Sequence, residues 1–180
     1  MRTTERNNHP AHHLAKMSGP DRANYYLIAI YTGYRFTEVS RLTRESFHLH
    51  GSNPTITLKG RGTKNKVFAI QPVPLDVAGR LQKWLDSIPA SRPLWPVKRL
   101  ADYTGSKMIY QDLDRAGIPR KTEAGCIDFH ALRTTYITLL ALAGVPIQQA
   151  QVLARLSSPQ ILMDHYTKLG INELGQQVAK

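Results

Sequence analysis

The sequence predicts a mostly helical α+β domain, a helical bundle with one small antiparallel three-stranded sheet or hairpin. Apolar residues recur at helical spacing in most segments. Only residues 54–71 combine β-branched or alternating runs with a glycine-containing centre, which is typical of a hairpin. With 180 residues, the chain is long enough for one domain with a hydrophobic core and short for two.

The domain is expected to cover residues 20–170, between a flexible N-terminal segment 1–19 and a C-terminal tail 171–180. The first segment is polar and aperiodic and ends in Ser-Gly-Pro. Asp21 predicts the N-cap of the first helix, and Gly33 predicts its end.

The later elements follow from local signals. A short helix is expected around Glu38, and strands at 54–59 and 66–71 flank a basic tip. Proline can open a helix because its missing N–H costs nothing in the first turn, and glycine can end one. The expected helices are 75–88, 107–116, 129–143, one that begins at Pro146 and one from Pro159 to Tyr166, with a polar loop at 119–125.

Composition indicates the kind of partner and compartment. The formal charge is +11, from 24 Lys and Arg against 13 Asp and Glu, which predicts a polyanionic partner, usually nucleic acid. A merely basic, solvated surface is the alternative. The single cysteine, Cys126, excludes an internal disulfide and is expected to be a buried, inert thiol. Because the sequence has neither a long apolar run nor a signal peptide, we expect a cytoplasmic protein that binds no membrane.

Five residues form an ordered set with the chemistry of phosphodiester transfer. Two guanidiniums, an ammonium and an imidazole can hold one phosphodiester through an anionic transition state. Guanidinium donates paired hydrogen bonds to phosphate oxygens, and imidazole exchanges protons near neutral pH. A phenol can act as a nucleophile and take over the phosphate covalently. The five residues are Arg35, Lys64, His130, Arg133 and Tyr166.

Each of these residues also has a structural interpretation. Arg35 and Glu38 are three residues apart on one helical face and suit a surface ion pair. His130 suits a half-buried cap of its own helix, and Lys64 suits a solvated basic loop. Tyr166 differs from most other tyrosines because polar residues flank it, so its hydroxyl is expected to be exposed.

The order and spacing of the set resemble the tyrosine recombinases, the phage-integrase-like family of DNA strand-exchange enzymes. The segments 32–42, 64–74, 128–138 and 153–166 look like the corresponding boxes of that family. The resemblance covers residues 20–170, nearly the whole chain.

By position, the resemblance implies a role for each residue of the set. Arg35 and Arg133 would clamp the nonbridging oxygens of the scissile phosphate. Lys64 would be the general acid for the 5′-hydroxyl leaving group, and His130 would assist proton transfer. Tyr166 would be the nucleophile.

Other residues would support the site. Glu38 would hold the active-site framework together rather than take part in the chemistry. Lys59, on the same hairpin as Lys64, competes with it for the role of general acid. The basic residues expected to bind DNA are Lys59, Arg61, Lys66 and Arg155.

Two features depart from the family pattern. Leu156, in Leu-Ala-Arg-Leu-Ser, stands where members usually carry a histidine or tryptophan. Leucine cannot bind a phosphate oxygen, and losing one such donor typically costs roughly 2.7–4 kcal/mol of transition-state stabilisation. The family's N-terminal helical domain is also expected to be missing, since few residues precede the first helix, so the chain would be a fragment or the product of a truncated gene.

No cofactor and no metal are expected. His48 and His50 could share one side of a strand, but no cysteine or carboxylate completes a tetrahedral metal site. No glycine-rich phosphate loop is present either. This agrees with transesterification, which conserves the bond energy in the phosphotyrosine.

The sequence is therefore interpreted as the catalytic domain of a site-specific DNA recombinase or integrase that cuts and rejoins double-stranded DNA through a 3′-phosphotyrosyl intermediate. The resemblance implies self-association as a tetramer on DNA and a monomer without it. Two alternatives stay open. One is a catalytically silent DNA-binding remnant of a recombinase, and the other is a type IB topoisomerase-like activity, which relaxes supercoils as a monomer.

Overall fold

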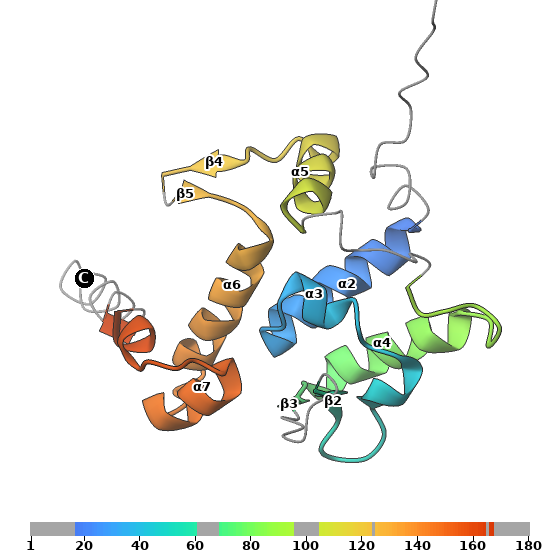
Figure 1. Cartoon of the computed structure of the whole chain (residues 1–180), viewed down its shortest axis with the longest axis horizontal. Helices are drawn as coiled ribbons and strands as arrows, with labels where there is room; N and C mark the ends of the chain where they lie inside the picture. Colours follow the sequence, from blue (N-terminus) through green and yellow to red (C-terminus); the bar gives the residue numbers. More distant parts are fainter. Residues whose placement is uncertain (1–16, 61–68, 96–104, 124, 165, 168–180) are drawn as a thin grey trace, which may run out of the picture.

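The fold is built around helix α2 (Gly19–Thr32), which lies between α6 (Phe129–Leu142) and α4 (Leu75–Ser87) (Figure 1). The computed structural model describes residues 17–60, 69–95, 105–123, 125–164 and 166–167. The other helices are α3 (Phe36–Val39), α5 (Gly105–Ala116), α7 (Ile147–Ala154) and the short 3-10 helix η1 (Arg44–Ser46); residues 160–164 and 166–167 are also helical.

The start of α2 differs from the prediction. Ser18 is the N-cap instead of Asp21: the Ser18 hydroxyl accepts a hydrogen bond from the Asp21 N–H over 3.2 Å, and the Asp21 carboxylate accepts one from the Ser18 N–H over 3.3 Å. This reciprocal capping box places Asp21 inside the first turn. Met17 is buried in the core. The last residues of the segment 1–19 therefore belong to the fold.

Helix α2 ends at Gly33, as predicted. Gly33 has a φ of 62°, in the left-handed region that favours glycine. A Cβ atom there would lie 2.5 Å from Cδ1 of Tyr136, a residue of α6. Glycine at this position therefore allows the end of α2 to approach α6 closely.

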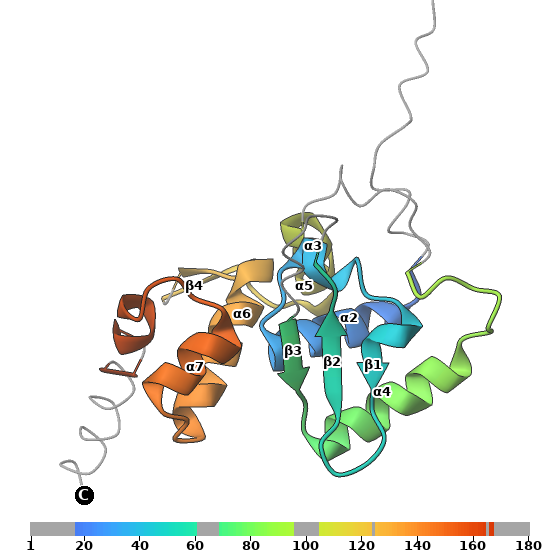
Figure 2. The same cartoon turned by 60° about the horizontal axis from the view of Figure 1, so that its bottom comes forward.

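The predicted fold class is confirmed: the protein is mostly helical and contains a small antiparallel sheet of three strands, in the order β1-β2-β3. Figure 2 shows the strands side by side, with α2 behind them. The predicted hairpin is the pair β2 and β3, whose register aligns Ile56 with Gln71, while its expected basic tip lies outside the described residues. The strands are β1 (Phe47–His48), β2 (Thr55–Leu58) and β3 (Ala69–Pro72).

A second, two-stranded hairpin replaces most of the polar loop expected at 119–125. Strands β4 (Lys121–Thr122) and β5 (Gly125–Cys126) pair antiparallel and stand away from the helices (Figure 1). Cys126 is exposed there, so the prediction of a buried thiol was wrong. The reason is that no core residue covers either face of this hairpin in the described part of the chain.

Two apolar clusters stabilise the domain. The larger one joins α2, α4 and the sheet around Tyr25, whose ring centre lies 4.7 Å from that of Trp95 and 5.8 Å from that of Phe129. The smaller one joins α6, α7 and the helical residues from 160 onward. None of the helices in the described part of the chain is long and apolar enough to cross a membrane.

Candidate active site

A cavity of about 280 Å³ opens beside the N-terminal ends of α3 and α6. Three of the predicted site residues line it: Arg35, His130 and Arg133. Two of them come from α6 and one precedes α3, so the fold brings together groups that lie far apart in the sequence. The other lining residues are Tyr34, Phe36, Thr37, Gly105, Ser106, Asp128 and Phe129.

Arg133 is the buried cation of this cavity, with 3% of its surface exposed. It donates one hydrogen bond to the carbonyl oxygen of Gly33 over 2.6 Å and another to that of Ala154. Burial, followed by the positive charges of Arg155 and Arg35, lowers the pKa of Arg133 to about 10. The guanidinium therefore stays charged at neutral pH and is held rigidly from two sides.

Arg35 is the exposed cation, with 56% of its side chain accessible. It is the N-cap residue of α3. Its backbone N–H donates to the Glu38 carboxylate over 2.8 Å, and its Nη1 lies 3.2 Å from the other oxygen of that carboxylate. The ion pair considered from the sequence is therefore present, and the same guanidinium also lines the cavity.

His130 lies in the first turn of α6 and is exposed. The cap of this helix is Asp128, whose side chain accepts a hydrogen bond from the Ala131 N–H over 3.0 Å. The alternative in which His130 caps its own helix is therefore wrong. Its imidazole is open to solvent at the cavity and accessible to a ligand.

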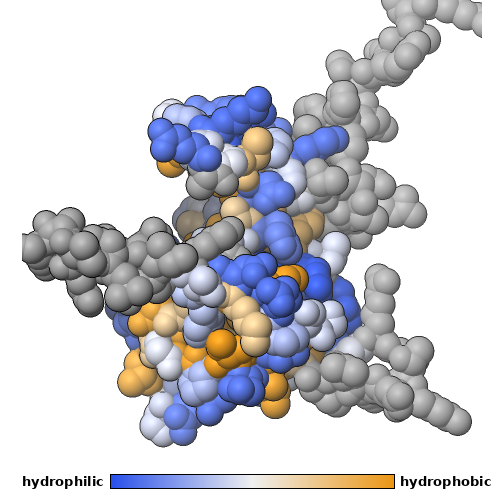
Figure 3. Space-filling model, turned by 90° about the vertical axis from the view of Figure 1, so that its left-hand side faces the viewer, coloured by the Kyte–Doolittle hydropathy of each residue, from blue (hydrophilic) through white to orange (hydrophobic). Residues whose placement is uncertain are grey.

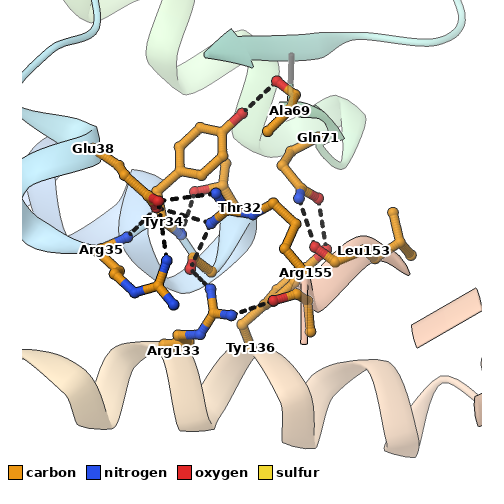
Figure 4. A network of polar contacts seen from close by, with 12 residues as sticks. Thr32, Tyr34, Arg35, Glu38, Ala69, Gln71, Arg133, Tyr136, Leu153 and Arg155 are labelled. Atoms are coloured by element: carbon orange, nitrogen blue, oxygen red, sulfur yellow. Dashed lines mark hydrogen bonds and ion pairs between the residues drawn. The ribbon is translucent and has the colours of Figure 1, made fainter. Parts of the chain in front are cut away.

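A polar network ties the α2–α3 turn to the end of α7 (Figure 4). The Arg155 guanidinium donates to both oxygens of Glu38, over 2.9 and 3.1 Å, and to the carbonyl of Gly33 over 3.3 Å. It also stacks on the ring of Tyr34, with Cζ 4.8 Å from the ring centre. Burial raises the pKa of Glu38, but the hydrogen bonds from Arg155 and from the backbone of Arg35 outweigh this and hold it below its usual value.

Comparison with known proteins identifies the family. A sequence model of the phage integrase family matches residues 7–172, which is most of the chain. The chain belongs to the phage integrase family. The resemblance stated from the sequence is thereby confirmed.

Solved structures of site-specific recombinases and integrases have a similar fold. The XerH site-specific recombinase bound to palindromic difH substrate is 21% identical, with a TM-score of 0.59 over 91% of this chain and 47% of that one. The Tn1549 transposon integrase with circular intermediate DNA is 15% identical, with a TM-score of 0.60 over 91% and 63%. The catalytic domain of bacteriophage HP1 integrase is 19% identical, with a TM-score of 0.53 over 87% and 80%. The chain thus spans only part of the first two proteins, and no curated protein sequence matches it.

Tyr166 is not among the described residues that line the cavity. Its ring packs against the smaller apolar cluster, and its hydroxyl donates a hydrogen bond to the carbonyl oxygen of Val145 over 2.6 Å. Burial raises the pKa of this phenol. Tyr166 is half-buried, and its hydroxyl is engaged by Val145 rather than free in solvent, because the apolar residues of α6 and α7 provide a surface on which the ring can dock.

Leu156, the residue that departs from the phage integrase family pattern, packs against the same cluster as Tyr166. Lys59 is exposed at the end of β2, where its carbonyl accepts a hydrogen bond from Arg41. The proposed general acid and two of the proposed DNA-binding residues lie outside the described residues: Lys64, Arg61 and Lys66.

Sequence reasoning missed two supporting residues. Arg155 was expected to bind DNA, yet its guanidinium is engaged within the protein. Gln71, 1% exposed, donates to the Leu153 carbonyl over 2.6 Å and accepts a hydrogen bond from the Tyr136 hydroxyl over 3.0 Å, so it links β3 to α6 and α7. No local pattern could have indicated either role, because each partner lies far away in the sequence.

Proposed function

We propose that this chain is the catalytic domain of a tyrosine recombinase that cuts and rejoins double-stranded DNA through a 3′-phosphotyrosyl intermediate. The observation that carries the proposal is the single cavity lined by Arg35, His130 and Arg133 in a chain of the phage integrase family. Two cations and one imidazole at one cavity are suited to a phosphodiester. The proposed catalytic domain covers residues 20–170.

In the proposed reaction, Arg35 and Arg133 bind the nonbridging oxygens of the scissile phosphate and stabilise the charge that develops in the transition state. The phenolic oxygen of Tyr166 attacks phosphorus, and its proton leaves with assistance from His130. The bond to the 5′-oxygen breaks, and Lys64 gives that oxygen a proton. Attack by a 5′-hydroxyl reverses these steps and rejoins the strand.

The position of Tyr166 sets a requirement for this reaction. The hydrogen bond to Val145 and the contacts with the smaller cluster must break before the phenol can reach a phosphate at Arg133. We propose that DNA binding supplies the free energy for this movement. Since Lys59 remains exposed beside the hairpin, it stays the competing candidate for the general acid.

Self-association on DNA is part of the proposal. An apolar cavity of about 410 Å³, lined by residues that include Tyr136, Leu139 and Leu153, lies on the α6–α7 side. Exposed Leu142 and Val152 extend this apolar surface, and Figure 3 shows apolar side chains (orange) on that side of the molecule. Sedimentation with and without a recombination site measures the assembly: a tetramer on DNA and a monomer without it are expected. We place the protein in the cytoplasm, where an exposed cysteine such as Cys126 stays reduced.

A nicked DNA substrate tests the proposed function. When the nick lies just to the 3′ side of the scissile phosphate, cleavage releases a short fragment that carries the new 5′-hydroxyl. This fragment diffuses away, so the strand cannot be rejoined and the covalent protein–DNA adduct is trapped. An adduct with wild type and none with Tyr166→Phe supports strand cleavage by the proposed nucleophile. DNA binding with no adduct on a cognate site favours the silent DNA-binding remnant. Relaxation of supercoiled plasmids without specific sites favours the topoisomerase-like alternative.

A further inference from the structure

Arg155 adopts a backbone conformation that costs free energy for its residue type. It is the C-cap of α7, with φ 52° and ψ 48°, and is the only residue other than glycine with a positive φ in the described part of the chain. Glycine or asparagine usually occupies this position of a helix end. Residues that keep an unfavourable backbone conformation are often functional. The side chain of Arg155 is therefore a candidate for a functional role.

The side chain of Arg155 forms a salt bridge with Glu38. Its two terminal nitrogens lie 2.9 and 3.1 Å from the two carboxylate oxygens, in the bidentate geometry that makes arginine–carboxylate pairs strong. The side chains are 22% and 16% exposed, so water competes little for this pair. Arg155 is not among the residues that line the cavity. The contact of Arg155 that leads toward this cavity is therefore the one with Glu38.

Glu38 is shared between two arginines. Arg35 reaches the carboxylate with one side-chain nitrogen, over 3.2 Å, and this nitrogen approaches the oxygen that Arg155 also contacts. The Arg35 side chain is 56% exposed, against 22% for Arg155. Among the guanidiniums, the less exposed one of Arg155 thus holds the carboxylate mainly, and the one of Arg35 at the cavity holds it only weakly.

This arrangement decides how available Arg35 is to a phosphate. Without Arg155, Oε2 of Glu38 would keep its hydrogen bond from the Arg35 backbone N–H, but both oxygens would regain an acceptor position for a bidentate pair with the Arg35 guanidinium. A phosphate would have to displace that pair. With Arg155 in place, the carboxylate is already neutralised and the Arg35 guanidinium keeps most of its donors. The same α7 end also supplies the Ala154 carbonyl that holds Arg133.

We infer that Arg155 is a positioning residue that occupies Glu38 and so keeps Arg35 available to the scissile phosphate. The inference rests on the proposed function, which assigns Arg35 to that phosphate. It differs from a direct DNA contact by Arg155, because it requires Glu38 as the intermediary.

The availability of Arg35 can be measured without DNA or cleavage. An arginine-selective reagent such as 4-hydroxyphenylglyoxal modifies accessible guanidiniums, and mass spectrometry gives the rate at each residue. Arg115, with 70% of its side chain exposed, is the internal reference. In Arg155→Gly, which suits the left-handed backbone, modification of Arg35 is expected to slow by about two- to fivefold, the effect of one added, partly exposed ion pair.

The control is the same pair of proteins in a Glu38→Gln background. There the change at Arg155 should leave the Arg35 rate unaltered, because no carboxylate remains to compete for it. A rate in Arg155→Gly that equals or exceeds wild type would overturn the inference, as would a slowing that persists with Glu38→Gln.

A second variant guards against loss of folding. Arg155→Lys keeps the charge and the backbone conformation but loses the two-pronged contact, so a smaller slowing at Arg35 is expected. If Arg155→Gly does not fold, Arg155→Lys decides, and an unchanged or faster rate then overturns the inference. Failure of wild type to form a DNA adduct would instead overturn the proposed function and leave the Arg35 measurement valid.

Discussion

The hydroxyl of Tyr166 donates a hydrogen bond to the carbonyl oxygen of Val145, 2.6 Å away. Val145 lies in the turn between α6 and α7, whereas Arg133 and His130 lie nearer the start of α6. The proposed nucleophile is therefore docked away from the cations that would hold its target. The stability of this docking is expected to influence how fast the protein reacts with DNA.

Two substitutions at Leu156 distinguish two effects on the reaction rate: the missing hydrogen-bond donor to the phosphate, and the packing of the leucine beside Tyr166. Leu156→His is expected to speed adduct formation by up to about 100-fold if the imidazole reaches the phosphate. Leu156→Ala removes packing beside Tyr166 without adding a donor, and is expected to change the rate much less. Equal gains in the two variants would show that release of Tyr166, and not a new donor, limits the reaction. Single-turnover kinetics on a nicked substrate measures both.

Replacing arginine by lysine is expected to have unequal effects at the two sides of the cavity. Arg133→Lys replaces the two separate nitrogens that bind the carbonyls of Gly33 and Ala154 by a single one, so the free energy of unfolding should fall by about 2–4 kcal/mol. Arg35→Lys alters an exposed ion pair and should cost less than about 1 kcal/mol. Urea denaturation of the two variants provides the comparison, and equal losses would contradict the structural role of Arg133.

Acid should weaken the fold through Glu38. Its pKa is lower in the folded protein than its usual value of 4.5, so the carboxylate contributes stability above that value, and this contribution is lost as the pH falls through the folded pKa. The difference in free energy of unfolding between wild type and Glu38→Gln is expected to be constant from pH 6 to pH 8, where the carboxyl is ionised in both the folded and the unfolded chain, and to shrink below about pH 4.5. A difference that grows on acidification would contradict this assignment.

DNA binding should depend steeply on salt. A domain with a net charge of +11 that neutralises about four phosphates loses about 100-fold in affinity between 50 and 200 mM salt, because condensed counterions are released. Fluorescence anisotropy with a labelled duplex measures the slope. Arg35→Ala should lower affinity only modestly, since most phosphate contacts are expected outside the cavity. Binding that does not respond to salt would argue against a DNA partner.

Local signals predicted most of the fold, and non-local contacts decided the rest. Gly33 ends α2 and Pro146 precedes α7, as predicted, because the backbone preferences of glycine and proline act without help from the rest of the chain. Ser18 displaced Asp21 as the cap, a choice between neighbouring residues that the sequence alone does not settle. The predicted burial of Cys126 was wrong, because burial depends on which surfaces other elements provide. For the same reason the docking of the half-buried Tyr166 on α6 and α7 could not be predicted.

The candidate site was predictable to the extent that residue chemistry and order reveal it. Arg35, His130 and Arg133 do line one cavity. Glu38 was expected to support the site, but its partner could not be foreseen: Glu38 and Arg155 are 117 positions apart, and only the folded chain makes them a pair. The role of Gln71 could not be predicted for the same reason, since its hydrogen-bond partners lie on α6 and α7.

Identifying the protein atom that becomes attached to DNA tests the proposed nucleophile most directly. After reaction of wild type with a nicked cognate duplex, protease digestion and mass spectrometry locate the modified peptide. The proposed function predicts a 3′-phosphate ester on the oxygen of Tyr166, and no adduct with Tyr166→Phe. A DNA-linked peptide that lacks Tyr166, or an adduct of equal yield with Tyr166→Phe, would contradict it.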